Sequence, residues 1–224
     1  MNVQPTIRKP IRRIQQNLLA IQERRLLDWL CARMPGWVTP DQLTGIGMVG
    51  AAMILAGYMA SNVAPGWLLL SIAGYFVHWF GDSMDGSLAR FRRIERPNFG
   101  YFLDHSCDAM ATVMILGGLG LSPYIQIETA LLAMIGYLLL SIHAFLAARV
   151  MGELRLSYLG GGPTELRLLL IGITLAMLGF GTGPGWFGAV SGLDIFVGAC
   201  AFVLFVLFMV QSMAAGRILM QRGD

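Results

Sequence analysis

Six segments that are almost free of charged side chains constrain the fold of this chain more than any other feature. Each holds about 20 residues, the length that a helix needs to cross the hydrocarbon core of a bilayer. Only 13% of all residues are charged, against about 25% in a typical soluble domain. We therefore predict an all-α integral membrane protein with six transmembrane helices. The segments cover residues 43–62, 66–81, 99–121, 126–148, 166–184 and 191–215.

The positions of Lys and Arg predict how these helices are oriented. All 16 basic residues lie in the N-terminal segment, around 90–96, in the 149–167 connection or at the C-terminus, and the other three connections hold none. Cytosolic connections of membrane proteins carry an excess of Lys and Arg. We therefore expect a multi-pass membrane protein with both termini in the cytosol. Arg149, Arg155 and Arg167 cluster where an anionic ligand could be held, but anchoring at the cytosolic face explains them as well, so no role is assigned to them.

Residues 1–38 are expected to form a separate amphipathic segment in front of the membrane domain, residues 39–224. Pro10 favours the start of a helix over "PIRRIQQNLLAIQERRLLDWL". Such a helix is expected in the cytosolic interface with its apolar face toward the lipid; binding of a partner protein is the alternative. The segment has no apolar core of the signal-peptide kind, so no cleavable export signal is expected. The predicted apolar face consists of Ile11, Ile14, Leu18 and Ile21.

Cysteine usage and net charge exclude several function classes. Cys31, Cys107 and Cys200 show no CxxC or metal-ligand spacing, so they are interpreted as small buried residues. The net charge of +3 fits contact with anionic lipid at the membrane surface. Basic patches with interleaved aromatic residues, which indicate nucleic-acid binding, are absent from the sequence. Membrane lipids are the expected partners, and no nucleic acid is expected.

Four aspartates stand close together in the stretch "GDSMDGSLARFRRIERPNFGYFLDHSCDAM", residues 81–110. Asp82 and Asp85 are three residues apart, and Asp104 and Asp108 are four apart. On helices each pair projects from one face. Two helix ends joined by the loop 91–99 therefore bring four carboxylates face to face.

That arrangement needs a counter-charge. An ionised aspartate at membrane depth costs roughly 2.5–3.5 kcal/mol on insertion scales. Arg90 alone among the nearby basic residues is close enough in sequence to belong to the site. Carboxylate oxygens favour hard divalent ions, and four carboxylates suit a pair of ions of the kind that assists phosphoryl transfer. Helix caps and surface charges at the cytosolic boundary are the plainer explanation for any single aspartate.

The same stretch resembles the signature of the CDP-alcohol phosphatidyltransferase family, D-x2-D-G-x2-A-R-x8 or x9-G-x3-D-x3-D. Every fixed position of that signature is matched between residues 82 and 108. The resemblance implies two divalent cations, Mg²⁺ or Mn²⁺, held by Asp82, Asp85, Asp104 and Asp108. It also implies that Asp108 is the general base and that Gly86, Ala89, Arg90 and Gly100 bind the CDP part of the donor.

The resemblance implies a reaction in phospholipid biosynthesis. An alcohol, deprotonated by Asp108, attacks the phosphorus of a CDP-linked lipid donor, and CMP leaves. CDP-diacylglycerol is the expected donor, with both the donor and the site at the cytosolic side. The alternative donors are CDP-ethanolamine and CDP-choline, with diacylglycerol as the acceptor. The family resemblance also implies a homodimer.

Three further positions resemble parts of the family. "TPDQLT" resembles a P-N-x-x-T stretch, which implies donor binding by Thr44, although Asp41 replaces the usual Asn; a helix-capping Asp41 is the alternative. "LDHSCD" and "GPTE" are similar to stretches of the choline and ethanolamine phosphotransferase branch, with Ser106 replacing a Gly. They imply His105 and Glu165 as catalytic candidates. The alternative is a helix capped by Thr164 with Glu165 in its first turn.

His78 and His143 are single histidines within apolar segments. His78 lies one turn before Asp82 and is a candidate to orient that carboxylate; hydrogen bonds between helices are the plainer explanation for both. Two other function classes stay open. A small cation transporter predicts polar residues through the middle of several spans, whereas here they gather at the cytosolic ends of two. A lipid-binding scaffold without catalysis is the other.

Overall fold

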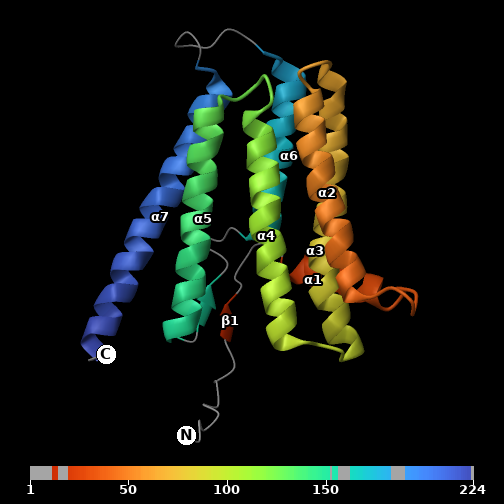
Figure 1. Cartoon of the computed structure of the whole chain (residues 1–224), viewed down its shortest axis with the longest axis vertical. Helices are drawn as coiled ribbons and strands as arrows, with labels where there is room; N and C mark the ends of the chain where they lie inside the picture. Colours follow the sequence, from red (N-terminus) through yellow and green to blue (C-terminus); the bar gives the residue numbers. More distant parts are fainter. Residues whose placement is uncertain (1–11, 15–19, 152, 156–161, 183–189, 223–224) are drawn as a thin grey trace, which may run out of the picture.

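Six long helices, α2 to α7, lie side by side in the part of the chain that the structure describes, and a short helix, α1, lies against one end of them (Figure 1). The computed structural model describes residues 12–14, 20–151, 153–155, 162–182 and 190–222. In chain order the elements are β1 Arg12–Ile14, α1 Ala20–Cys31, α2 Pro40–Ala60, the 3-10 turn η1 Pro65–Trp67, α3 Leu68–Arg92, α4 Pro97–Gly120, α5 Ile127–Met151, β2 Glu153–Arg155, α6 Pro163–Phe180 and α7 Gly192–Arg222.

The helices α2 and α3 pack so closely that their backbones touch. A Cβ atom added to Gly81 would lie 2.2 Å from the backbone nitrogen of Gly47, and one added to Gly50 would lie 2.3 Å from the nitrogen of His78. Small residues such as glycine allow the backbones of two apolar helices to approach this closely. Because the two helices are antiparallel, this packing places the start of α2 beside the end of α3, where the aspartates lie.

Capping residues and a proline define where the helices of the site begin and end. Thr39 caps α2 in a capping box with Gln42, which satisfies two backbone N–H groups that the first turn leaves unpaired. Helix α3 ends at Arg92, and the residue that caps it, Arg93, has a left-handed φ of 56°. Pro97 then starts α4 after three more residues. The tight connection folds α4 back along α3 and brings Asp82 and Asp104 to the same end of the bundle.

A cluster of buried hydroxyl groups joins α6 to α2 and α3. The Tyr58 hydroxyl lies 3.1 Å from that of Tyr75 and 2.7 Å from Oγ1 of Thr174. These three residues come from α2, α3 and α6, and all are almost fully buried. Each hydroxyl has a partner, so no desolvated polar group is left unpaired there. The cluster lies within the large apolar core that fills the middle of the bundle.

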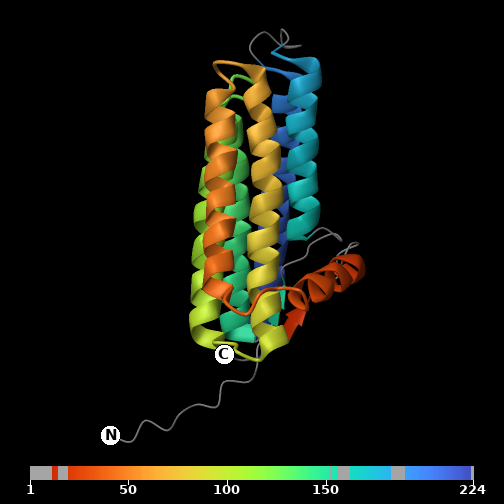
Figure 2. The same ribbon diagram turned by 90° about the vertical axis from the view of Figure 1, so that its right-hand side faces the viewer.

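Four helices of the described chain are long and apolar enough to cross a membrane by length and composition, namely α2, α5, α6 and α7. Many of their large apolar side chains are exposed, as at Val49, Phe180 and Phe202, which is expected where the surroundings are lipid rather than water. The other two long helices, α3 and α4, carry the aspartates and run beside them over a similar length (Figures 1 and 2). The structure therefore supports a helical integral membrane protein.

The predicted N-terminal helix from Pro10 is wrong over Arg12–Ile14. These residues form β1, which pairs in parallel with β2, Glu153–Arg155. A short isolated helix is marginal in water, whereas pairing with β2 gives the backbone hydrogen-bond partners. The helical part is α1, which begins at Ala20 and lies obliquely beside α3 (Figure 2). Ile11 and Leu18 lie outside the described residues.

Candidate active site

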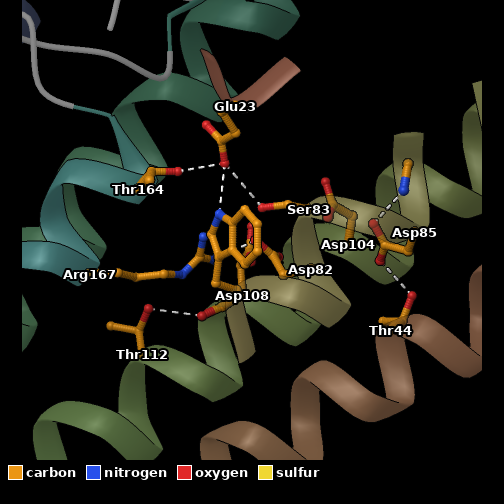
Figure 3. Close-up of polar contacts among 12 residues, drawn as sticks. Glu23, Thr44, Asp82, Ser83, Asp85, Asp104, Asp108, Thr112, Thr164 and Arg167 are labelled. Carbon is orange, nitrogen blue, oxygen red and sulfur yellow. Dashed lines mark hydrogen bonds and ion pairs between the residues drawn. The ribbon is translucent and has the colours of Figure 1, made fainter. Parts of the chain in front are cut away.

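The four aspartates predicted to form one site line a single small pocket at one end of the bundle (Figure 3). α3 contributes Asp82 and Asp85, and α4 contributes Asp104 and Asp108. Spacings of three and four residues place the two members of each pair on one face of their helix. The structure therefore brings together all four side chains that the sequence pattern singled out. The remaining lining residues are Thr44, Gly47, Met48, His78 and Cys107.

Asp85 is the most buried of the four carboxylates, with 8% of its surface exposed. One oxygen accepts a 2.6 Å hydrogen bond from the Thr44 hydroxyl, and the other accepts from the backbone N–H of Gly86. Both donors are neutral. Asp85 is thus oriented and fixed by α2, but these partners do not balance its charge.

Asp82 forms an ion pair with Arg167 of α6. The arginine is almost buried, with 11% of its side chain exposed, and the aspartate is 23% exposed. Removal of either partner from such a buried pair leaves an uncompensated charge. No role was assigned to Arg167 from the sequence, where anion binding and anchoring at the cytosolic face explained it equally well, so its pairing with Asp82 was not predicted. A lone arginine in the second turn of an otherwise apolar helix was the available signal.

Asp104, His105 and Asp108 lie close enough together to share a metal ion: one potential ligand atom from each lies within 4.8 Å of the others. The Nδ1 atom of His105 is 3.4 Å from Asp104 and 3.8 Å from Asp108. The His105 ring is buried between Tyr101 and Phe145, stacked on the latter at 4.8 Å. This packing fixes the ring beside the two carboxylates, so the structure places His105 next to the site.

The donor set of the pocket fits divalent cations. Four carboxylates face one another across the lining, and the ion pair of Asp82 with Arg167 offsets one of them. The partners of the most buried one, Asp85, are uncharged. Several oxygen ligands with an excess of negative charge are what Mg²⁺ and Mn²⁺ prefer. The described residues thus supply a site of the right chemistry.

The predicted CDP-binding positions lie on the same two helices as the aspartates, α3 and α4. Gly86 lies directly after Asp85, and a Cβ atom there would lie 3.2 Å from the Arg90 guanidinium. Arg90 donates to the Ser87 hydroxyl at 3.2 Å. Gly100 is exposed, and a Cβ atom there would meet nothing within 4 Å. Ala89 is partly buried on the same helix. None of these four is in the pocket lining itself.

Two capping alternatives from the sequence are wrong in detail. Thr39, not Asp41, caps α2, and Asp41 forms an exposed ion pair with Arg96. The N-cap of α6 is Gly162 rather than Thr164, but Glu165 does lie in the first turn as expected, where it accepts a 2.9 Å hydrogen bond from the Gly162 N–H. Pro163 explains the shift, because proline favours the first helical position and so places the cap one residue before it. Glu165 is not in the pocket lining among the described residues.

His78 lines the pocket one turn below Asp82. It is 5% exposed, and its Nδ1 atom has no hydrogen-bond partner among the described residues. His143, by contrast, lies 3.2 Å from the Ser212 hydroxyl and joins α5 to α7. The sequence interpretation of an interhelical hydrogen bond is therefore confirmed for His143.

Glu23 of α1 is a polar residue near the site that the sequence analysis missed. One of its oxygens accepts hydrogen bonds from the Trp79 indole at 2.9 Å, the Ser83 hydroxyl at 3.3 Å and the Thr164 hydroxyl at 2.8 Å. Figure 3 shows this carboxylate above the Asp82–Arg167 pair, between α3 and α6. Its role depends on long-range packing, and no local sequence pattern signals that.

Fold and site together define a helical membrane protein with a carboxylate-lined pocket at one end of the bundle. Comparison with known families makes the assignment specific. The sequence profile "CDP-alcohol phosphatidyltransferase" matches residues 37–220, which is most of the chain. The chain belongs to this family, as the resemblance of the aspartate stretch indicated.

Two kinds of curated relative are similar to parts of this chain. Cholinephosphotransferase 1 of Danio rerio is 38% identical over 97 residues, which cover 41% of this chain and 25% of that protein. The archaetidylinositol phosphate synthase of Methanothermobacter thermautotrophicus is 30% identical over 118 residues, 53% of this chain and 56% of that protein. Its counterpart in Pyrococcus horikoshii is 24% identical over 139 residues, 62% and 63% of the two chains. The match spans about a quarter of the first relative and somewhat under two thirds of the others.

Proposed function

We propose that this chain transfers a phosphatidyl group from CDP-diacylglycerol to an alcohol acceptor and releases CMP. The observation that supports this most directly is the set of four aspartates on α3 and α4 that line one pocket. They are the fixed acidic positions of the family signature, and the family profile extends over the whole helical bundle. The archaetidylinositol phosphate synthases, whose match covers more of this chain than that of Danio rerio cholinephosphotransferase, support an acceptor of the polyol-phosphate kind.

In this proposal Asp82, Asp85, Asp104 and Asp108 hold two divalent cations, Mg²⁺ or Mn²⁺. When bound, such ions neutralise the pyrophosphate of the donor and make its phosphorus a better electrophile. Arg90 binds a phosphate oxygen of the CDP group. Gly86, Ala89 and Gly100 leave room for the nucleotide, and Thr44 both supports Asp85 and faces the donor.

The proton of the acceptor hydroxyl passes to Asp108. Of the two carboxylates beside His105, Asp108 is the more exposed, with 45% of its side chain exposed against 29% for Asp104. A new bond forms between the acceptor oxygen and the phosphorus, and the bond from that phosphorus to the bridging oxygen of CMP breaks. His105 lies within 3.8 Å of Asp108 and is suited to assist this proton transfer. Glu165 is the more remote candidate for the same role.

A second candidate function uses CDP-choline or CDP-ethanolamine with diacylglycerol as the acceptor. Two observations favour it: the 38% identity with Danio rerio cholinephosphotransferase 1, and the buried His105 against Asp104 and Asp108. Cation transport is the weaker hypothesis, since the four carboxylates lie on two helices, α3 and α4, and line one pocket instead of being spread along several helices.

The architecture proposed for this function has six transmembrane helices, residues 39–224, with α3 and α4 as two of the spans. Residues 1–38 form the cytosolic segment, with α1 in the membrane interface. Both termini and the site face the cytosol of a bacterial cytoplasmic membrane, and the working unit is a homodimer. The lipid donor enters sideways from the cytosolic leaflet.

The decisive experiment measures CMP release by the purified protein from CDP-diacylglycerol, CDP-choline and CDP-ethanolamine, each with a panel of acceptors. We expect release from CDP-diacylglycerol with Mg²⁺ or Mn²⁺, loss with EDTA, and a new lipid product by mass spectrometry. Asp108→Asn should remove it, whereas Glu128→Gln at the opposite end of the bundle should not. Release from the CDP-amino alcohols alone would establish the second candidate, and release from none would refute both.

A further inference from the structure

The contact of α1 with the rest of the bundle reaches residues that flank the candidate site. Glu23 is partly buried, and its carboxylate accepts hydrogen bonds from three neutral donors on two helices, α3 and α6. A carboxylate with three well-placed donors is held more firmly than one with a single surface partner. This contact therefore joins three elements that lie far apart in the sequence.

The two donors on α3 lie on either side of Asp82 in the sequence. Trp79 lies three residues before Asp82, and Ser83 lies directly after it. Both donate to the same oxygen of Glu23, at 2.9 and 3.3 Å. The carboxylate of Glu23 thus fixes α1 to the turn of α3 that carries Asp82.

The donor on α6 lies on the same face as the partner of that aspartate. Thr164 is three residues before Arg167, so their side chains are neighbours on the helix. Thr164 donates to Glu23 at 2.8 Å, and Arg167 pairs with Asp82. The two contacts are successive links between α3 and α6, one through Glu23 and one direct (Figure 3).

Charge explains why an acidic residue suits this position. Thr164 is the second residue of α6, so the Glu23 carboxylate lies at the positive N-terminal end of that helix. An anion there is stabilised by the helix dipole. A glutamine would keep the acceptor oxygen but lose this part of the attraction.

We propose that Glu23 is a positioning residue that acts through Arg167: it holds the start of α6 against α3, so that Arg167 faces Asp82 in the candidate site. The inference rests on the proposed function for its catalytic consequence, but the contact itself is independent of it. The N-terminal helix is thereby part of the active-site framework and more than a membrane anchor.

The contact is tested without activity by the indole signals of protein labelled with ¹⁵N-tryptophan. The chain has five tryptophans, and Trp79→Phe identifies the signal of Trp79. In Glu23→Ala this signal should move and its N–H should exchange faster with solvent, whereas Asp28→Ala, an exposed acidic residue on the same helix, should leave it unchanged. An unchanged Trp79 signal in Glu23→Ala would overturn the proposal.

The positioning role is tested by a double-variant cycle of Glu23→Ala and Arg167→Met. The cycle compares the free energy of unfolding and the rate of CMP release. If Glu23 acts through Arg167, Arg167→Met should cost less stability in the Glu23→Ala background than in the wild type. Glu23→Ala should lower kcat about tenfold or more, Glu23→Gln should recover part of it, and the double variant should be no slower than Arg167→Met. Additive losses in both measurements would refute the positioning role. Absence of CMP release in the wild type would refute the proposed function instead, and the stability cycle would still decide the role of Glu23.

Discussion

At the scale of single residues, the hydroxyl of Thr44 determines how Asp85 is presented to the pocket. Asp85 is nearly buried and accepts from Thr44 at 2.6 Å. The Pro40 carbonyl, a competing acceptor, is farther from the hydroxyl at 3.3 Å, so the single hydroxyl proton is directed to Asp85. Thr44 therefore connects the capped start of α2 to the acidic face of α3.

Replacement of Thr44 tests this support. Thr44→Val keeps the shape but removes the hydrogen bond, and we expect the apparent affinity for Mn²⁺ or the rate of CMP release to fall about 10- to 100-fold, as for other residues that orient a metal ligand. Thr44→Ser, which keeps the hydroxyl, should retain most of the wild-type value. Titration with Mn²⁺ measures both variants, and equal values for Val and Ser would show that the hydroxyl does not matter.

Arg167 provides a second prediction at this scale, on stability. Arg167→Met leaves Asp82 without its guanidinium partner, and loss of one member of a buried pair costs about 3–5 kcal/mol. In EDTA the Tm of this variant should lie well below that of the wild type. Addition of Mg²⁺ should raise the Tm of the variant more than that of the wild type, because a ligand stabilises the state that binds it and the variant has the larger excess of negative charge.

The matched control for that measurement is Arg149→Met, at an exposed position of α5, which should behave as the wild type with and without Mg²⁺. A Tm for Arg167→Met that equals the wild-type value in EDTA would contradict the importance of the pair.

Much of the site could be predicted because its residues are local in sequence. Asp82, Asp85, Asp104 and Asp108 lie at helical spacings within 27 residues, so secondary structure alone brings each pair onto one face. Arg167 could not be assigned in this way, since its partner is 85 residues away. Glu23 is 141 residues from Thr164, and only the packing of α1 reveals that they meet.

At the scale of helices, the contact between α2 and α3 sets the geometry of the pocket. Gly47 and Gly81 touch through their backbones, and one turn further along Thr44 reaches Asp85. The sequence predicted both helices from their apolar composition, but not how near they approach. That distance depends on which faces of the two helices meet, and the position of glycines alone does not specify it.

Gly81→Ala tests the close contact. The added methyl group would lie 2.2 Å from the nitrogen of Gly47 and 2.5 Å from the carbonyl oxygen of Leu43, so the helices must separate. Overpacking costs about 1–3 kcal/mol, and we expect a lower Tm in detergent together with slower CMP release, since Thr44 and Asp85 move apart. Gly45→Ala on α2, where a Cβ atom meets nothing within 4 Å, should leave both unchanged. If Gly81→Ala were as stable as Gly45→Ala, the backbone contact would be refuted.

The N-terminal element shows where local pattern fails. Apolar spacing over residues 11–21 predicted one helix, yet Arg12–Ile14 pairs with Glu153–Arg155 as a strand. Strand pairing is decided by a partner far away in the chain, and a periodicity argument includes no such partner. From Ala20 onward the helical expectation holds, and Leu27 and Cys31 bury its inner side in a second apolar cluster with Leu43 and Leu88.

At the scale of the whole molecule, the proposed membrane orientation follows from charge. The connection after α3 holds basic residues, and so does the one between α5 and α6, whereas those after α2, α4 and α6 hold none. By the positive-inside rule the aspartate pocket then faces the cytosol, where CDP-linked donors and divalent cations are supplied. Composition alone marks α2, α5, α6 and α7 as membrane-crossing, so the assignment of α3 and α4 as spans needs a direct test.

Labelling of single cysteines provides that test in a variant with Cys31, Cys107 and Cys200 replaced by Ser or Ala. A cysteine at Asn62, beyond the end of α2, and one at Pro123, beyond the end of α4, both exposed positions, should react with an impermeant maleimide on intact spheroplasts. A cysteine at Ile94, between α3 and α4, should react only after permeabilisation. If α3 and α4 both cross the bilayer, these positions must alternate; labelling of Ile94 together with Asn62 from outside would mean that α3 does not span. Because the pocket lies between these two helices, that result would also place the aspartates away from the cytosolic donor and refute the proposed route of entry.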